Sequence, residues 1–377
     1  MKNKESYTMK EIYQQPILWQ KIYDMVEGNE SSIAAFMKSI IDANSDVIFT
    51  GAGSSFFIGE MVSSIFQKDT GLSSRAISST EIVTHPDEFI NSNKPTLLVS
   101  FARSGNSPES LASVNIANKV SNKVKHLIIT CNKEGALSEL KNDKDSFVLV
   151  LPDEANDRSL AMTSSVTSMA LVALLIGRLP SLKKQEIEIQ NASKAIEYFF
   201  SKYSSAIKEI ATVEYDRAVF LGSGSMVGVA REAHLKLQEL TDGKIISKFD
   251  SFLGFRHGPK AIVNSKTLMV YMFSNNEYVR QYEYDLVSSI KNVHNPILSI
   301  GISNLHIIEE IGKELDMSIN VIKDGVQLDD GIWTIASLVV AQLLATSKSI
   351  ELGFNPDSPS KTGAIHRVVQ GVTIYEH

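Results

Sequence analysis

The chain has 377 residues, of which 43% are hydrophobic and 21% charged, as is typical of a globular protein with an ample buried core. Its formal net charge of −6 argues against a nucleic-acid partner, which would need a basic surface, although a local site can still bind an anion. A single cysteine excludes an intrachain disulfide and a zinc cluster of thiolates.

No segment of the sequence predicts export or membrane insertion. The N-terminal stretch is polar and charged without the apolar core of a signal peptide, and the apolar stretch Met169–Ile176 is too short to span a bilayer. We therefore expect a cytoplasmic protein with no membrane partner. The histidines are scattered without metal-ligand spacing, so we expect no metal site, and no motif calls for a cofactor.

Hydrophobic runs alternate with helix-compatible stretches along the chain, which predicts βαβ units. The runs are rich in Val, Ile and Leu with little polar alternation, as in strands that are buried on both faces of a parallel sheet. The predicted strands are Val47–Thr50, Thr96–Ser100, His126–Thr130 and Phe147–Leu151 in the first half, and Ala218–Leu221, Leu268–Phe273, Pro296–Ile300 and Ser318–Ile322 in the second.

Longer helical patterns divide the chain into segments. Ser181–Thr212 is helical and charged and is expected to bridge the two halves, while Gly331–Leu352 is predicted to be another helix. The predicted organisation is a helical segment 1–34, a first domain 35–180, a helical linker 181–215, a second domain 216–352 and a tail 353–377 near the active site.

A strand that runs into a Gly-x-Gly-Ser turn occurs twice. The first copy spans Asp46–Ser55 and the second spans Arg217–Met226, so that Gly51 and Gly222 are separated by 171 residues (222 − 51). A repeat of this length predicts a duplicated domain rather than a solenoid.

The first of these turns is a candidate phosphate-binding loop. Its glycines let the backbone approach a ligand, and the helix that follows presents N–H groups to an anion. Gly53, Ser54 and Ser55 are therefore candidate phosphate contacts. Phe56 stands where a dinucleotide motif needs a third glycine, which argues against an oxidoreductase. The alternative is a tight strand-to-helix turn that binds no ligand.

The stretch Ser100–Ser110 predicts a second part of a phosphate site. It follows a predicted buried strand, and Ser107 and Pro108 suit the N-cap and the first position of a helix. Ser104 adds a hydroxyl and Arg103 a positive charge, which together favour a phosphate monoester. The alternative is a capped helix start whose serines serve only the cap.

Glu232, Lys236 and Glu239 share one face of a predicted helix that begins after the second Gly-x-Gly-Ser turn. A solvated salt-bridge face is the usual meaning of such a charge run. The position after a strand of an α/β sheet, where ligands bind, favours a functional role instead.

Two further motifs supply candidates. His257, followed by Gly258 and Pro259, lies at a probable helix start and is a candidate proton shuttle, although a structural role is commoner for a single histidine. Thr163 and Ser164 precede an apolar helix, where they either cap the helix or contact a substrate.

Together these motifs resemble the sugar isomerase (SIS) domain family. The resemblance rests on Gly-x-Gly-Ser-Ser after one strand, a serine-rich turn after another, and a Lys-x-x-Glu helix before His-Gly-Pro. It covers most of the chain and implies an α/β fold of two tandem parallel-sheet SIS domains, each a flavodoxin-like, three-layer αβα sandwich. The stretches Ser100–Ser110, Ala161–Ser165, Gly254–Lys260 and Arg367–Val372 are similar to the AgaS group in particular.

The resemblance also implies roles for individual residues. Glu239 matches a glutamate that moves a proton between C1 and C2, Lys236 matches a lysine of the same helix, and His257 matches a ring-opening histidine that can come from a neighbouring subunit, so we expect a homodimer. The implied phosphate contacts are Gly53, Ser54, Ser55, Arg103, Ser104 and Ser107, and other implied substrate contacts are Thr163, Ser164 and Arg367.

The residues also mark a departure from the family. The sequence is also similar to the isomerase half of glucosamine-6-phosphate synthase, which has a lysine near its C-terminus that forms an imine with the ketose. The corresponding stretch here, His366–Gly371, contains no lysine, and Lys361 is not aligned with it.

The implied function is an aldose/ketose isomerase that acts hydrolytically on galactosamine 6-phosphate, releasing ammonia and leaving tagatose 6-phosphate. A plain tagatose-6-phosphate ketose/aldose isomerase would use the same proton shift. A non-catalytic sugar-phosphate sensor is the alternative from another class, because the same fold also serves regulators. The implied partner is a small sugar phosphate.

Overall fold

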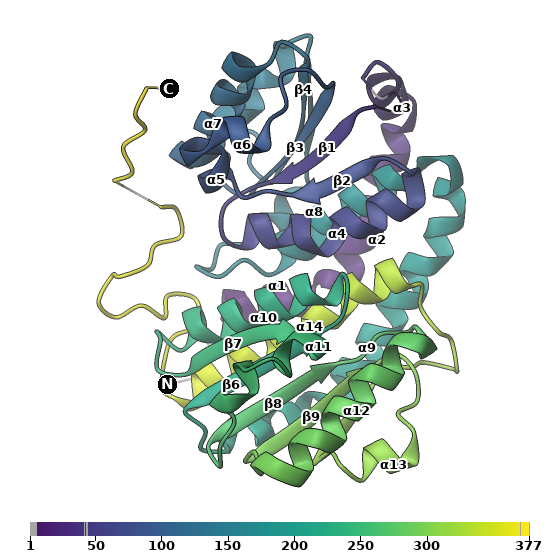
Figure 1. Cartoon of the computed structure of the whole chain (residues 1–377), viewed down its shortest axis with the longest axis vertical. Coiled ribbons are helices and arrows are strands. Elements are labelled where there is room, and N and C mark those ends of the chain that lie inside the picture. The colour runs from purple at the N-terminus through teal and green to yellow at the C-terminus, as the bar shows by residue number, and fades with distance from the viewer. Residues whose placement is uncertain (1–5, 41, 43, 370, 377) are drawn as a thin grey trace. The chain divides into compact units, whose positions relative to one another are not determined.

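The computed structural model describes residues 6–40, 42, 44–369 and 371–376 (Figure 1). Residues 1–5, at the start of the predicted N-terminal segment, and Gln370, in the Arg367–Val372 motif, lie outside these ranges. The chain forms two compact units. The A-sheet unit comprises Ile17–Arg158, Ser164–Glu186 and the chain from Ile365 onward, and the B-sheet unit comprises the chain up to Pro16, Ser159–Thr163 and Ile187–Ala364.

Each unit therefore draws on several stretches of sequence. The predicted domains were continuous segments, and their boundaries stay predictions. Helices α2 (Gln15–Gly28) and α9 (Leu182–Thr212) each run from one unit into the other.

The A-sheet unit contains a five-stranded, wholly parallel sheet in the order β2-β1-β3-β4-β5. The strand order reverses between β1 and β3, both of which are buried along their whole length. The strands are β1 (Asp46–Thr50), β2 (Ser73–Ala76), β3 (Thr96–Ala102), β4 (Val124–Thr130) and β5 (Ser146–Val150).

Helices cover both faces of this sheet, which explains its burial. On one face α4 (Ser54–Thr70) and α8 (Ser164–Gly177) pack against each other and the strands (Figure 1). The other face carries α5 (Ser79–Thr84), α6 (Pro86–Phe89) and α7 (Pro108–Val120). The remaining elements of the unit are α3 (Glu30–Lys38) and the short 3-10 helices Ala136–Asn142, Asp153–Ala155 and Leu179–Ser181.

The B-sheet unit repeats this plan. Its five-stranded parallel sheet has the order β7-β6-β8-β9-β10, which is the A-sheet order with each strand replaced by its counterpart. The strands are β6 (Arg217–Gly222), β7 (Ile246–Ser251), β8 (Thr267–Met272), β9 (Leu298–Ser303) and β10 (Met317–Asn320).

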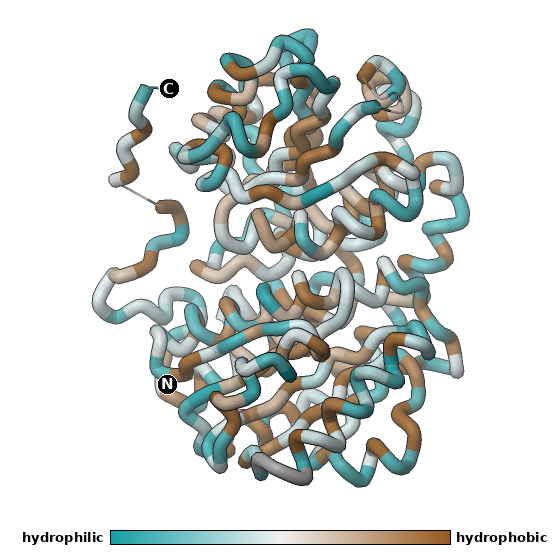
Figure 2. The backbone as a smooth tube through the Cα atoms, in the orientation of Figure 1, coloured by the Kyte–Doolittle hydropathy of each residue, from teal (hydrophilic) through white to brown (hydrophobic). Residues whose placement is uncertain are grey.

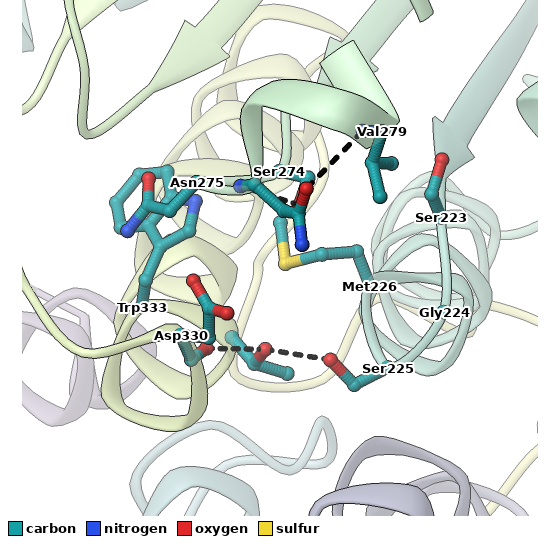
Figure 3. A pocket seen from close by; sticks show the side chains of 11 residues that line it. Ser223, Gly224, Ser225, Met226, Ser274, Asn275, Val279, Asp330 and Trp333 are labelled. Atoms are coloured by element: carbon teal, nitrogen blue, oxygen red, sulfur yellow. Dashed lines mark hydrogen bonds between the residues drawn. The ribbon is translucent and has the colours of Figure 1, made fainter. Parts of the chain in front are cut away.

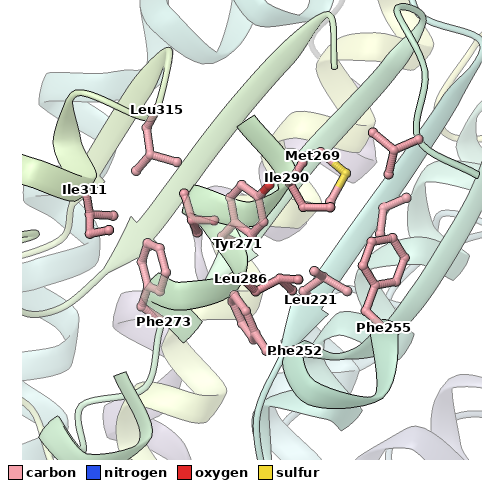
Figure 4. Close-up of a cluster of buried hydrophobic side chains, with 13 residues drawn as sticks. Leu221, Phe252, Phe255, Met269, Tyr271, Phe273, Leu286, Ile290, Ile311 and Leu315 are labelled. Atoms are coloured by element: carbon pink, nitrogen blue, oxygen red, sulfur yellow. The ribbon is translucent and has the colours of Figure 1, made fainter. Parts of the chain in front are cut away.

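One face of sheet B carries α10 (Met226–Leu240) and α14 (Asp330–Glu351), which pack against each other, and α14 also contacts α1 (Tyr7–Tyr13). The other face carries α11 (Phe252–Phe255), α12 (Glu277–His294) and α13 (Glu309–Gly312), with a 3-10 helix at Pro259–Ile262. Figure 4 shows the core on this face, where Leu286 and Ile290 of α12 cluster with Met269 and Tyr271 of β8 and with Phe273, which directly follows the strand.

The predicted fold class is confirmed, and all eight predicted strands are present to within a few residues at their ends. Two strands were missed. β2 and β7 lie at an edge of each sheet and are half-exposed, so they lack the continuous apolar run that marks a central strand. In Figure 2 the central strands are largely brown, the colour of hydrophobic residues.

The helical predictions also agree with the structure. The predicted helices correspond to α9 and α14, and the apolar segment before Ile176 forms α8. Of the described residues, α14 has the length and composition to span a bilayer, which the sequence reading overlooked in naming only the shorter stretch of α8. In the structure 94% of its most apolar window is buried, as expected for a core helix.

Burial of His126 in β4 predicts an acid-sensitive A-sheet unit. Desolvation lowers the pKa of His126 to about 4. Between about pH 6.5 and pH 4 the unfolded chain therefore binds a proton that the folded chain does not, so stability falls as the pH drops through this window. We expect a loss of about 2 kcal/mol at pH 5 relative to neutral pH, measured by denaturant unfolding.

His126→Gln should flatten that pH dependence because glutamine does not titrate. His85→Gln, at an exposed position, is the matched control and should leave the slope unchanged. An unchanged slope in His126→Gln would show that another group is responsible.

Candidate active site

The first glycine turn connects β1 to α4. Gly53 is the N-cap of α4 with φ 57°, a left-handed conformation that favours glycine. Gly51 is required for a different reason: a Cβ on it would lie 2.6 Å from the Ser55 Cβ. The turn thus brings the buried Ser54 and Ser55 to the N-terminus of a 17-residue helix, where the helix dipole favours an anion.

The loop after β3 lies at the neighbouring strand end. Ser107 is the N-cap of α7 and Pro108 its first residue, as predicted. The Ser107 side chain makes no capping hydrogen bond, however, and instead pairs with the Ser110 hydroxyl at 2.6 Å. Gly105 has φ 67°, and the Asn132 side chain donates to the Ser104 carbonyl at 2.8 Å, so the loop is held against the chain that follows β4.

Arg103 and Arg367 come together within the A-sheet unit. The Arg103 side chain is buried, and its Nη2 donates to the Arg367 carbonyl at 2.7 Å. The Arg367 guanidinium donates to the Asp157 carbonyl at 2.6 Å and to the Asn156 side chain at 2.7 Å. The predicted substrate contact Arg367 therefore anchors its segment of the tail beside a predicted phosphate contact.

Asp157 is a residue that the sequence reading missed. It is fully buried, and its carboxylate accepts hydrogen bonds from the backbone N–H groups of Ser164 and Ser165, each at 3.0 Å. Asp157 therefore caps the start of α8, and the choice between capping and substrate contact for Thr163 and Ser164 stays a prediction. Asp157 lies seven residues before Ser164, the first residue of α8 (164 − 157), so the usual N-cap position immediately before a helix does not identify it in the sequence.

Thr163 groups with the B-sheet unit. It is fully buried, and its carbonyl accepts a hydrogen bond from the Gln342 side chain of α14 at 3.2 Å. In this contact the backbone carbonyl of Thr163 joins its segment to α14.

A buried charge cluster lies on α10. Lys236 is 1% exposed, and its ammonium lies 3.3 Å from Glu232 Oε1 and 2.5 Å from Glu239 Oε2. Glu232 is fully buried, whereas the Glu239 side chain is 24% exposed. The three charges share a helix face as predicted, but the alternative of a solvated salt-bridge face is wrong, because Glu232 and Lys236 are buried.

Charge pairing fixes the protonation state of the lysine. Burial acts to lower the pKa of Lys236, and the two carboxylates outweigh it, so that the pKa lies above its usual value. Lys236 is therefore an ammonium at neutral pH and a hydrogen-bond donor, not a nucleophilic amine.

His257 differs from its predicted setting. It precedes a four-residue 3-10 helix, Pro259–Ile262, and Gly258 has φ 115° between them, so no long helix supplies a dipole there. His257 itself is exposed, and among the described residues neither Lys236 nor Glu239 hydrogen-bonds its ring.

The tail lysine offers no sign of an activated amine. Lys361 is exposed, its backbone N–H donates to Asp242 at 3.3 Å, and its ammonium lies 4.7 Å from the centre of the Phe354 ring.

Comparisons with known proteins agree with this arrangement. Residues 39–177 match the SIS domain family. The D-galactosamine-6-phosphate deaminase AgaS of Shewanella sp. (strain ANA-3) is 37% identical over 98% of this chain and 92% of its own length. The chain belongs to the SIS domain family, within its AgaS group.

Solved structures give the same result. A tagatose-6-phosphate ketose/aldose isomerase from Escherichia coli superposes with a TM-score of 0.89 at 33% identity, over 98% of this chain and 96% of that one. A structure from Clostridium novyi NT, named as a candidate isomerase of the same kind, has a TM-score of 0.95 at 39% identity over 98% and 95% of the two chains. The chain therefore belongs to a family of phosphosugar enzymes.

The buried cluster predicts an asymmetric response to mutation. Lys236→Met should lower the free energy of unfolding by about 3–5 kcal/mol, because it removes one partner of a buried ion pair. Denaturant unfolding measures the loss, and adding Glu232→Gln should restore part of it. Lys313→Met removes an exposed pair with Glu309 and should cost less than about 1 kcal/mol. Equal losses in the two lysine variants would contradict the burial argument.

Proposed function

We propose that this chain is a phosphosugar aldose/ketose isomerase that acts as a deaminase on galactosamine 6-phosphate, giving tagatose 6-phosphate and ammonia. The observation that carries the proposal is the Lys236–Glu239 pair on α10, a partly exposed carboxylate held by a buried ammonium at 2.5 Å. Such an arrangement presents an oriented base to a substrate. A relative that is 37% identical bears the name of this deaminase activity.

The proposed chemistry is a proton shift followed by hydrolysis. With the sugar ring open, Glu239 removes the proton from C2, and the electron pair forms a C1–C2 double bond while O1 takes up a proton. Returning the proton to C1 leaves a C2 iminium. Water adds at C2, the C–N bond breaks, and ammonia leaves a ketone. Atoms balance with water as the co-reactant, and the shift needs a single base able to reach both carbons.

Lys236 acts in this scheme as a positioning residue. Its ammonium binds one carboxylate oxygen of Glu239 and is itself held by Glu232, so the Glu239 carboxylate loses little orientational freedom on binding substrate. His257 is assigned to ring opening on the family resemblance, and its exposed position leaves the imidazole accessible.

Phosphate binding is assigned to the A-sheet unit. Ser54 and Ser55 at the start of α4 supply hydroxyls, and Gly53 allows close approach of the backbone. Arg103 supplies the positive charge, with Ser104 and Ser107 on the same loop. Phosphate binding energy would orient C1 and C2 for the proton shift.

A plain tagatose-6-phosphate ketose/aldose isomerase is the second candidate, because a structure with a TM-score of 0.89 bears that name. It would use Glu239 in the same way and release no ammonia. We further propose a cytoplasmic homodimer, since the family resemblance allows His257 to serve a neighbouring subunit; the mass in solution by light scattering tests the dimer.

Glu239→Gln should abolish ammonia release from galactosamine 6-phosphate by the purified chain. The amide is isosteric but cannot accept the C2 proton, so we expect a fall in kcat of at least a hundredfold with KM little changed. Gln238→Glu, at the exposed neighbouring position, adds a carboxylate off the buried face and should retain activity.

Three outcomes separate the candidates. Ammonia from the wild type and none from Glu239→Gln supports the deaminase. Conversion of an aldose phosphate to tagatose 6-phosphate without ammonia supports the isomerase. If the chain binds a sugar phosphate but turns over no hexose phosphate, the result would favour the non-catalytic sensor.

Arg103→Met should raise KM for the phosphorylated substrate at least tenfold while changing kcat less, because a charged contact to phosphate contributes about 1.5–3 kcal/mol. Steady-state kinetics in the deaminase assay measures KM and kcat separately. Arg75→Met, a half-exposed arginine of the same unit paired with Asp46, should leave KM unchanged. A KM equal to that of the wild type would show that Arg103 does not contact the substrate phosphate.

A further inference from the structure

The C-terminal tail is attached to the A-sheet unit at Arg367. Its guanidinium donates to the Asp157 carbonyl through Nη2 at 2.6 Å and Nε at 3.0 Å, and Nη2 also donates to the Asn156 side chain at 2.7 Å. Nε and Nη2 form the fork with which an arginine binds a phosphate or carboxylate, and here the fork is engaged by acceptors of the chain itself. The side chain of Arg367 therefore fixes its own backbone, which lies outside every described helix and strand.

The fixed backbone of Arg367 in turn holds Arg103. Arg103 directly follows β3, its side chain is 6% exposed, and its Nη2 donates to the Arg367 carbonyl at 2.7 Å. Both residues belong to the A-sheet unit. A buried guanidinium is stable only where acceptors of the protein meet its N–H groups, so the acceptors determine where its charge lies. The tail carbonyl thus helps to set the position of the Arg103 guanidinium.

The other end of this chain of contacts is anchored in the core. Asp157 is fully buried, and its carboxylate accepts from the first two N–H groups of α8. Its carbonyl is the acceptor for the Arg367 guanidinium. A continuous path of hydrogen bonds therefore runs from α8 through Asp157 and Arg367 to Arg103.

The electrostatics of a neighbouring thiol show that the two arginines act on the same place. Burial raises the pKa of Cys131, which follows β4, and the Asp157 carboxylate raises it further, whereas the Arg103 and Arg367 guanidiniums oppose that rise. Arg367 therefore contributes both positive charge and hydrogen bonds at this strand end, and an experiment on its role has to separate the two.

The corresponding position of the B-sheet unit is held differently. The offset of 171 that relates the two glycine turns also relates the strand pairs β1–β3 and β6–β8, and it places Ser274 at the position of Arg103. Arg280 of α12 donates to the Ser274 carbonyl at 2.6 Å, and Glu283 of the same helix accepts from the Ser274 N–H at 3.0 Å. Figure 3 shows this loop, which lines a pocket together with the glycine turn after β6. The B-sheet unit thus fixes this position from its own next helix, whereas the A-sheet unit uses the tail.

We propose that Arg367 is a positioning residue, whose backbone carbonyl orients the Arg103 guanidinium for the phosphate of the substrate. Arg367 then does not contact the phosphate itself, in contrast to the role that the family resemblance implies for it. This inference rests on the proposed function, because it takes Arg103 as the phosphate-binding cation.

The test is calorimetric titration of the full chain with inorganic phosphate. Arg367→Lys keeps the charge but not the planar fork, so phosphate binding should weaken by about threefold or more as the tail carbonyl loses its place. Arg367→Met should weaken it at least as much. Arg367 is exposed, so both variants should fold, and an unchanged denaturation midpoint checks this.

Arg75→Met is the matched control. Arg75 is another arginine of the A-sheet unit that donates to a backbone carbonyl, that of Phe89, at 2.9 Å, and it also pairs with Asp46 at the start of β1. Its removal should leave phosphate binding unchanged.

A double-mutant cycle separates positioning from direct contact. In an Arg103→Met background, Arg367→Lys should have no further effect on phosphate binding, because the side chain that it positions is absent. An Arg367 that contacts phosphate directly would give the same fold loss in both backgrounds.

The positioning role is overturned if the fold losses are equal in the two backgrounds, or if either Arg367 variant binds phosphate as tightly as the wild type does. If the wild type does not bind phosphate, or if Arg103→Met binds it as the wild type does, the proposed phosphate site fails and this inference fails with it. Binding is measured without turnover, so an inactive deaminase assay alone would not affect the result.

Discussion

The buried ammonium of Lys236 is the interaction on which the proposed chemistry depends. Two carboxylates from its own helix, those of Glu232 and Glu239, compensate its charge. The arrangement costs desolvation free energy and gives orientation in return. A freely rotating carboxylate would lose conformational entropy when a substrate binds, whereas the Glu239 carboxylate is already held in one orientation by Lys236.

The second constraint is the turn that each unit uses to pass from its first strand into a helix. Other atoms lie so close to Gly51 and Gly222 that a Cβ on either residue would clash with them. Gly53 and Gly224, two residues later in each copy, both have φ 57°. The turn is therefore preserved by sterics alone. Side chains at the aligned positions, such as Ser55 and Met226, differ between the two copies while the backbone turn is the same.

Duplication allows one topology to carry different side chains at equivalent positions. Arg103 in one unit and Ser274 in the other stand at equivalent positions after equivalent strands. Replacing a guanidinium with a hydroxyl removes a positive charge from that position. A fold of this kind carries function in a few side chains at the strand ends, and the remainder of each unit positions them.

The sequence by itself determined the parallel α/β class, the duplication, the central strands and the residues of the charged helix face, because hydrophobic runs and helical spacing are local properties. Tertiary structure alone decided that this face is buried, that Asp157 accepts hydrogen bonds from the start of α8, and that β2 and β7 complete the sheets. Burial, edge pairing and contacts between residues distant along the chain depend on what packs nearby, and no local pattern encodes that.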